Sequence, residues 1–95
     1  LLVDCLTLWL SNLMAAERDL GVAGDALIAA IAARSGAVVL VGNEVGQGVV
    51  PANALARRFR DEAGRLHQRV AAACDDVYFV TAGLPQTLKG APPPV

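Results

Sequence analysis

Residues 37–51 read AVVLVGNEVGQGVVP, and this stretch decides the interpretation of the fold. Ala37 to Val41 are aliphatic and uncharged, so they fit a strand buried on both faces, as in the middle of a parallel sheet. A run of glycines and polar side chains follows at once: Gly42, Asn43, Glu44, Gly46, Gln47 and Gly48. Because open α/β sheets bind ligands at the carboxyl ends of their strands, this loop is a candidate binding site.

Two other apolar runs resemble this strand. Residues 1–3 (LLV) end in Asp4, and residues 77–80 (VYFV) end in Thr81, Ala82 and Gly83. Alternation of strands with helices predicts right-handed crossovers and three parallel strands. We therefore expect Asp4, the loop 43–48 and residues 81–83 to share one edge of the sheet, with residues 84–89 folding back over it.

Three helical patterns separate the strands. The first covers residues 7–18, and the second covers 26–34, with Asp25 as its cap after a loop at 19–24. The third begins after Pro51 and Asn53 and covers residues 54–73. Its apolar stripe has helical spacing and consists of Leu55, Phe59, Ala63, Leu66 and Val70.

Composition restricts the class of protein. The 95 residues suffice for one small domain, and a net charge of -1 with few aromatic residues gives no reason to expect a nucleic-acid partner. No stretch reaches the length that spans a membrane. Cys5 and Cys74 match no metal-ligand spacing and are interpreted as buried thiols of a cytoplasmic protein. Leu1 lies inside an apolar run without a methionine, so we expect the chain to begin within a larger protein.

Asp4 has two interpretations. An aliphatic run that ends in Asp is the Walker B pattern, in which the carboxylate holds Mg²⁺ beside nucleotide phosphates. Many buried strands also end in Asp because the next turn needs an acceptor. Most arginines of residues 54–73 are expected on a solvated face, but Arg57 and Arg58 lie beside the polar loop, where a guanidinium could reach a phosphate.

Several motifs are absent from the sequence. There is no G-x-x-x-x-G-K-[ST] phosphate loop, and the sole lysine, Lys89, lies near the tail. His67 is the only histidine, and it lies more than two helical turns from the polar loop, so we interpret it as structural or solvent-facing. Trp9 is expected at the rim of the core, with base stacking or a partner contact as the alternative.

Residues 1–89, and within them above all 1–13 and 38–89, resemble the C-terminal half of the bifunctional adenosylcobinamide kinase / adenosylcobinamide-phosphate guanylyltransferase family. The most specific part is the run from Asn43 to Arg69, with the pattern N-E-V-G-x-G-[IV]-V-P-x-N-x-L-A-R-x-F-R-D-x-A-G-R. The resemblance implies a partial three-layer P-loop NTPase (RecA-like) parallel sheet over residues 1–89 that lacks the P-loop strand and helix. Residues 90–95 are expected to form a mobile Pro-rich tail.

The resemblance also implies a function in cobalamin biosynthesis. Such enzymes phosphorylate adenosylcobinamide with ATP or GTP, then accept GMP from GTP onto a histidine and pass it to the phosphate, giving adenosylcobinamide-GDP. The implied ligands are Mg²⁺, GTP, ATP and the corrinoid. The P-loop and the guanylylated histidine lie upstream of Leu1 in the family, so no catalytic residue is expected within this chain, His67 included, and the chain alone is expected to be inactive.

Site residues follow from the same resemblance. Asp4 falls at the Walker B position, as a ligand of Mg²⁺ through water, and Asn43 and Glu44 fall where P-loop folds often keep a sensor of the phosphates. With these we group the remaining candidate nucleotide-binding residues, Gly46, Gly48 and Arg57. The intact protein is expected to be a homo-oligomer. Two alternatives stay open: half of another P-loop kinase or ATPase, and a non-catalytic assembly module.

Overall fold

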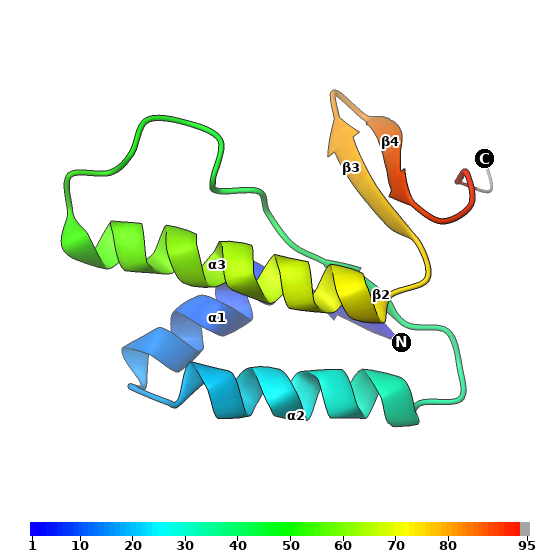
Figure 1. The fold of residues 1–95 in the computed structure, drawn as a ribbon, viewed down its shortest axis with the longest axis horizontal. Helices are drawn as coiled ribbons and strands as arrows, with labels where there is room; N and C mark the ends of the chain where they lie inside the picture. The colour runs from blue at the N-terminus through cyan, green and yellow to red at the C-terminus, as the bar shows by residue number, and fades with distance from the viewer. Residues whose placement is uncertain (94–95) are drawn as a thin grey trace.

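The computed structural model describes residues 1–93, so the last two positions of the expected tail, residues 94–95, lie outside it. Figure 1 shows helices α2 and α3 running along the long axis of the molecule, with a hairpin beyond the C-terminal end of α3. The elements in chain order are β1 (Leu2–Asp4), α1 (Leu6–Ala15), α2 (Leu20–Ala33), β2 (Val39–Val41), α3 (Ala54–Ala73), β3 (Val77–Thr81) and β4 (Leu84–Lys89).

Strands β1 and β2 form the parallel pair that the aliphatic runs predict. Val3 lies opposite Leu40, and Asp4 lies opposite Val41. Val3 and Leu40 pack against the core of the helices, because alternate residues of a strand point to opposite faces. The other face of the pair carries exposed aliphatic side chains: Leu2, Val39 and Val41.

The prediction of a third parallel strand is wrong. Strand β3 pairs antiparallel with β4 in a separate two-stranded sheet, with Thr81 opposite Leu84. Ala82 and Gly83 both have positive φ angles, 54° and 75°, and such a two-residue turn suits the twist of a hairpin. Residues 81–83 are therefore part of this hairpin and do not join the edge of the β1–β2 sheet.

The helices agree with the sequence in part. Helix α3 has the predicted bounds, and the Asn53 side chain caps it by accepting hydrogen bonds from the backbone N–H groups of Leu55 and Ala56 at 2.8 and 3.2 Å. Helix α1 ends at Ala15, earlier than expected. Helix α2 begins at Leu20 and is capped by Asp19, so the loop predicted at 19–24 and the cap predicted at Asp25 are wrong.

The core lies where α1 crosses α3. Its buried apolar side chains are Leu6, Leu10, Ala63, Leu66 and Val70. Ala63 is fully buried, and its small side chain allows the helices to approach closely. Trp9 is partly buried against this cluster, which confirms its place at the rim of the core, whereas Leu55 is exposed and lies outside it. Within residues 1–93, none of the helices combines the length and hydrophobicity that crossing a bilayer requires.

Candidate functional site

The parallel pairing brings Asp4 and Asn43 to one edge of the β1–β2 sheet. Asp4 ends β1 opposite Val41, and the chain reaches Asn43 two residues after Val41. The Asp4 side chain is exposed, and within residues 1–93 it takes part in none of the ion pairs. The predicted common edge is thus present for these two residues, and it presents a free carboxylate to solvent.

A chain of hydrogen bonds links this edge to the start of α1. The Asn43 N–H donates to the Thr7 hydroxyl at 3.4 Å, and that hydroxyl lies 2.8 Å from Sγ of Cys5. Cys5 is the N-cap of α1, and its sulfur accepts from the Leu8 N–H at 3.5 Å. The hydrogen bonds from Thr7 and Leu8 stabilise the thiolate, and they lower the pKa of Cys5 below its ordinary value.

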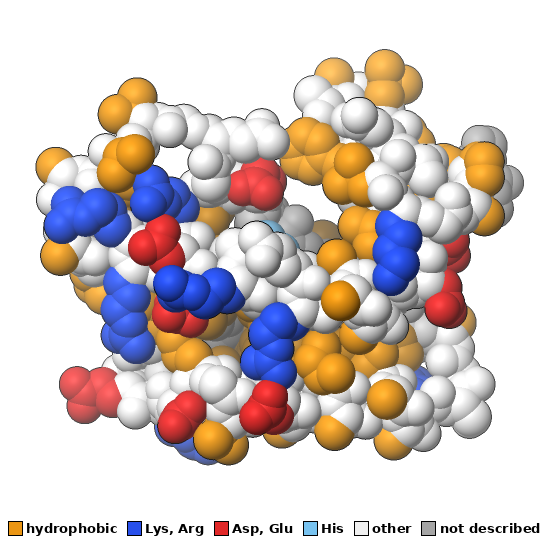
Figure 2. All heavy atoms as spheres, in the orientation of Figure 1, with side chains coloured by type: hydrophobic (Ala, Val, Ile, Leu, Met, Phe, Trp, Pro, Cys, Tyr) orange, Lys and Arg blue, Asp and Glu red, His pale blue; other side chains and the backbone are white. Residues whose placement is uncertain are grey.

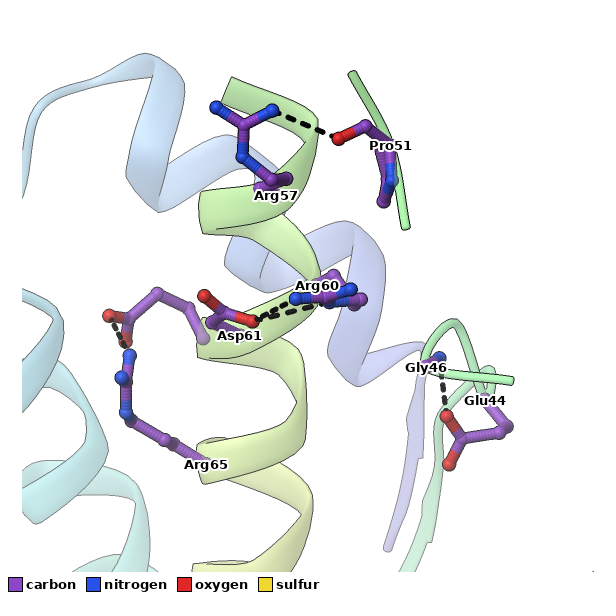
Figure 3. Close-up of polar contacts among 8 residues, drawn as sticks. Glu44, Gly46, Pro51, Arg57, Arg60, Asp61 and Arg65 are labelled. Carbon is purple, nitrogen blue, oxygen red and sulfur yellow. Dashed lines mark hydrogen bonds and ion pairs between the residues drawn. The ribbon is translucent and has the colours of Figure 1, made fainter. Parts of the chain in front are cut away.

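The polar loop after β2 is exposed and partly closed upon itself. Figure 3 shows the Glu44 carboxylate turned back along the loop, where it accepts a hydrogen bond from the Gly46 N–H. An added Cβ at Gly48 would meet nothing within 4 Å. In this structure the Gly46 N–H is therefore occupied by a carboxylate, while Gly48 faces open space.

Arg57 does not point toward Asp4. Its guanidinium donates to the carbonyl oxygens of Pro51, at 3.0 Å, and Ala52, so it holds the far end of the loop against the first turn of α3 (Figure 3). Arg58, the other arginine expected near the loop, is exposed. The structure thus separates Arg57 from the edge that carries Asp4 and Asn43.

The remaining arginines of α3 largely pair with carboxylates at the surface, as the solvated-face interpretation predicts. Figure 2 shows blue and red side chains interleaved over this helix. The ion pairs join Arg60 to Asp61, Arg65 to Glu62, and Arg69 to Asp25 of α2. Neighbouring carboxylates neutralise these cations, so they do not form a concentrated anion site.

His67 lies closer to the candidate site than the sequence indicated. A Cβ built on Gly42, the residue before Asn43, would lie 2.7 Å from Nε2 of His67. The C-terminal half of α3 therefore packs over the end of β2, and the expectation that His67 is remote from the loop is wrong. Spacing along α3 alone gave no signal of this contact, because it depends on how the helix returns across the sheet.

A hollow of about 620 Å³ opens beside Asp4, between β1, α1 and α2. Trp9 and Arg18 line it, and Arg18 is a residue that the sequence did not single out. Its lining is otherwise mostly apolar: Val3, Cys5, Leu6, Leu13, Ala23, Ala26 and Leu27. Asp4 thus lies at the rim of a hollow whose lining is mostly apolar.

Among the candidate site residues, Asp4 is the one whose chemistry suits a metal ion. Residues 1–93 contain no group of three or more His, Cys, Asp or Glu side chains arranged to hold a metal ion. Mg²⁺ commonly binds one or two carboxylates and completes its shell with water and substrate phosphates. A single exposed carboxylate at a strand end matches that donor chemistry, so the residue present fits Mg²⁺ as part of a shell shared with a ligand.

Comparison with known proteins identifies relatives of this chain. The chain is similar to the bifunctional adenosylcobalamin biosynthesis protein CobP of Pseudomonas aeruginosa, at 50% identity over 94 positions, which cover 97% of this chain and 54% of the relative. It is similar to the bifunctional adenosylcobalamin biosynthesis proteins CobU of Salmonella typhimurium, at 41% identity, and Escherichia coli, at 38%.

These two matches cover 94% and 93% of this chain and 58% and 57% of the respective relatives. The chain thus spans a little over half the length of the curated relatives it matches. The family described as cobinamide kinase / cobinamide phosphate guanyltransferase matches residues 1–88. By this match over nearly its whole length, the chain belongs to the cobinamide kinase / cobinamide phosphate guanyltransferase family.

Proposed function

We propose that this chain supplies the acidic and polar edge of a nucleotide site in an enzyme of cobalamin biosynthesis. The enzyme phosphorylates adenosylcobinamide with ATP or GTP, then transfers GMP from GTP to that phosphate and releases adenosylcobinamide-GDP. The observation that supports this most strongly is the placement of Asp4 and Asn43 at one edge of the parallel pair, in a chain whose family is described by these two activities.

Each residue at this edge has a proposed role. Asp4 would hold Mg²⁺ through water, and that ion would supply positive charge against the phosphates. Asn43 presents its amide side chain to a phosphate oxygen. Gly46 and Gly48 offer backbone N–H groups to phosphate oxygens, as glycine-rich loops do.

The Glu44–Gly46 contact supports a change in the conformation of this loop as part of the proposal, at the point where nucleotide binds. The Glu44 carboxylate accepts from the Gly46 N–H, and a phosphate oxygen is an anionic acceptor of the same kind. Phosphate then replaces the carboxylate at this N–H, and Glu44 turns outward. Arg57 reaches the nucleotide only if it releases Pro51 and Ala52, so it acts in the nucleotide-bound form alone.

The rest of the proposed site lies in the part of the family's sequence that this chain does not span. We propose that a glycine-rich phosphate loop and the histidine that accepts GMP belong to the part of the curated relatives that this chain does not span, so that the 95 residues alone are inactive. With that part present, the β1–β2 pair becomes part of a three-layer P-loop sheet. The intact protein acts in the cytoplasm as a homo-oligomer.

The test is transfer of radiolabel from α-labelled GTP to the complete encoded protein. Asp4→Asn is expected to lower the labelling rate about 100-fold, because the carboxylate that holds the metal is lost. The matched control is Asp61→Asn, which removes a carboxylate from the surface of α3 and leaves labelling unchanged. Labelling of Asp4→Asn at the wild-type rate, or a complete protein that binds neither GTP nor cobinamide, contradicts the proposal.

An assembly module is the second candidate, because one face of the β1–β2 pair is bare. Leu2 and Val39 are 64% and 57% exposed, although soluble proteins usually cover large aliphatic side chains that gather on a sheet. Under this hypothesis the chain forms oligomers without nucleotide, and Asp4→Asn has no effect on any activity. The labelling rate of Asp4→Asn distinguishes this candidate from the enzyme, because oligomers are expected under both hypotheses, and sedimentation of a Val39→Thr variant then tests whether the bare face is the contact.

A further inference from the structure

The contact between Gly42 and His67 joins α3 to the end of β2. The imidazole occupies the space where a side chain at position 42 would begin, since an added Cβ would lie 2.7 Å from Nε2 and 3.4 Å from Cδ2. Real Cβ atoms do not approach so closely, so any larger residue at position 42 requires the end of the imidazole to shift. The ring therefore packs between α3 and the backbone at the end of β2.

The next residue is Asn43, which carries the candidate phosphate contact. Its N–H is bonded to the Thr7 hydroxyl on the opposite side, at the start of α1. The Gly42–Asn43 segment is thus held between a hydrogen bond to α1 and a ring from α3. A peptide held from two sides has a defined direction, although both of its residues are exposed, as are the loop residues 44–50 that follow.

The ring acts by its shape rather than by a hydrogen bond. Nε2 of His67 is buried and has no hydrogen-bond partner among residues 1–93. A buried nitrogen without a partner lowers stability, and such groups are uncommon in folded proteins. Among residues 1–93, the contact with Gly42 is therefore a packing contact of the ring and includes no hydrogen bond from Nε2.

We propose that His67 is a positioning residue: its ring, seated on Gly42, holds Asn43 at the edge of the sheet beside Thr7 and Cys5, where it can meet a phosphate. The inference rests on the proposed nucleotide site for its consequence in binding. The positioning itself is a property of the fold, and it can be measured without nucleotide.

Four variants of the complete encoded protein test the proposal. His67→Ala removes the ring, and His67→Phe keeps a flat ring and removes the unpaired nitrogen. Gly42→Ala places a methyl group against the ring, and the double variant Gly42→Ala/His67→Ala exchanges the ring for that methyl group. Gln68→Ala is the matched control, because Gln68 is the exposed neighbour of His67 on α3.

The first measurement is the exchange rate of the Asn43 amide hydrogen, which reports its bond to Thr7. We expect His67→Ala and Gly42→Ala to speed this exchange by about tenfold while amides in the middle of α3 keep their protection. His67→Phe and Gln68→Ala are expected to match the wild type. The double variant is expected to lie closer to the wild type than Gly42→Ala does, because the clash is relieved.

The second measurement is the dissociation constant for GTP, with the unfolding temperature recorded for each variant. Binding is expected to weaken about tenfold in His67→Ala and to remain unchanged in His67→Phe, even though the phenylalanine variant unfolds at a higher temperature. A merely structural role predicts instead that affinity follows the unfolding temperature across the series.

Three outcomes overturn the proposal. The exchange rate of the Asn43 amide is unchanged in His67→Ala, or His67→Phe weakens GTP binding as much as His67→Ala does. The third is a GTP affinity that follows the unfolding temperature alone across the variants. If the wild-type protein binds no GTP, the proposed nucleotide site is wrong. The exchange rate of Asn43 still decides whether His67 positions it.

Discussion

The backbone N–H of Asn43 donates a hydrogen bond to the side-chain hydroxyl of Thr7, 3.4 Å away, and this bond ties the loop after β2 to the first turn of α1. Thr7 is only 5% exposed, and it is the one buried polar side chain among residues 1–93. A hydroxyl can accept one hydrogen bond and donate another at once, so Thr7 can accept from Asn43 and donate to Sγ of Cys5.

Thr7→Val is expected to lower the free energy of unfolding by about 1–2 kcal/mol, because valine has the same shape but leaves the Asn43 N–H without its partner. Urea unfolding followed by circular dichroism measures the change. Thr87→Val, on the exposed strand β4, is the matched control and should change stability by less than about 0.5 kcal/mol. Equal losses in the two variants would show that the Thr7 bond contributes nothing.

The two cysteines are expected to react at different pH values. Hydrogen bonds from Thr7 and Leu8 lower the pKa of Cys5, whereas burial raises the pKa of Cys74. Only the thiolate is alkylated, so at neutral pH a larger fraction of Cys5 is reactive, and its rate reaches a plateau at a lower pH than that of Cys74. Mass spectrometry of iodoacetamide-treated protein between pH 6 and pH 10, a range set by the ordinary thiol pKa of about 8.5, measures both rates.

Thr7→Val also provides the control for this difference. Loss of the hydroxyl removes the largest cause of the lowered pKa, so the alkylation profile of Cys5 is expected to move to higher pH while that of Cys74 stays in place. A Cys5 profile that is the same in both proteins would mean that Thr7 does not stabilise the thiolate.

Patterns within single segments allowed much of the fold to be predicted. The stripe on α3 and the cap at Asn53 lie in one continuous stretch, and the observed helix has the predicted bounds. The parallel pair follows from two aliphatic runs separated by helices, because such a connection returns the chain in the same direction. That pairing alone was enough to place Asp4 and Asn43 at a common edge.

The errors arise where tertiary contacts outweigh local patterns. Gly21 and Gly24 suggested a loop, yet α2 runs through both, and a guanidinium from α3 fills the space beside Gly24. The hairpin at residues 77–89 depends on Ala82, a residue type that rarely adopts a positive φ angle. In the candidate site, the contact of His67 with Gly42 depends on how α3 lies across the end of β2.

Leu66 tests the core between the helices. It is 6% exposed and belongs to the buried cluster of α1 and α3. Leu66→Ala is expected to lower the free energy of unfolding by about 2–4 kcal/mol, since it removes buried methyl groups and leaves a cavity. Leu55→Ala changes the same residue type on the same helix at a site that is 65% exposed, and should cost less than about 0.5 kcal/mol. Similar losses at both positions would contradict the observed orientation of α3.

Gly24 tests how α2 and α3 are joined. The guanidinium of Arg69 lies over Gly24 and pairs with Asp25, so an alanine methyl group at position 24 would displace it. Alanine also favours a helix interior by about 1 kcal/mol over glycine. The ion pair is partly exposed, at 39% for Arg69 and 76% for Asp25, and such pairs contribute about 0–1 kcal/mol.

In the wild type, the helix propensity gained by Gly24→Ala and the loss of the Arg69–Asp25 ion pair are therefore expected to offset each other. Without Arg69, only the gain in helix propensity remains. Gly24→Ala should change the unfolding free energy by less than about 0.5 kcal/mol in the wild type and raise it by about 1 kcal/mol in an Arg69→Ala background. Urea unfolding of the four proteins of this cycle measures the difference. If Gly24→Ala has the same effect in both backgrounds, the guanidinium does not occupy the space beside Gly24, because two residues without contact contribute additively.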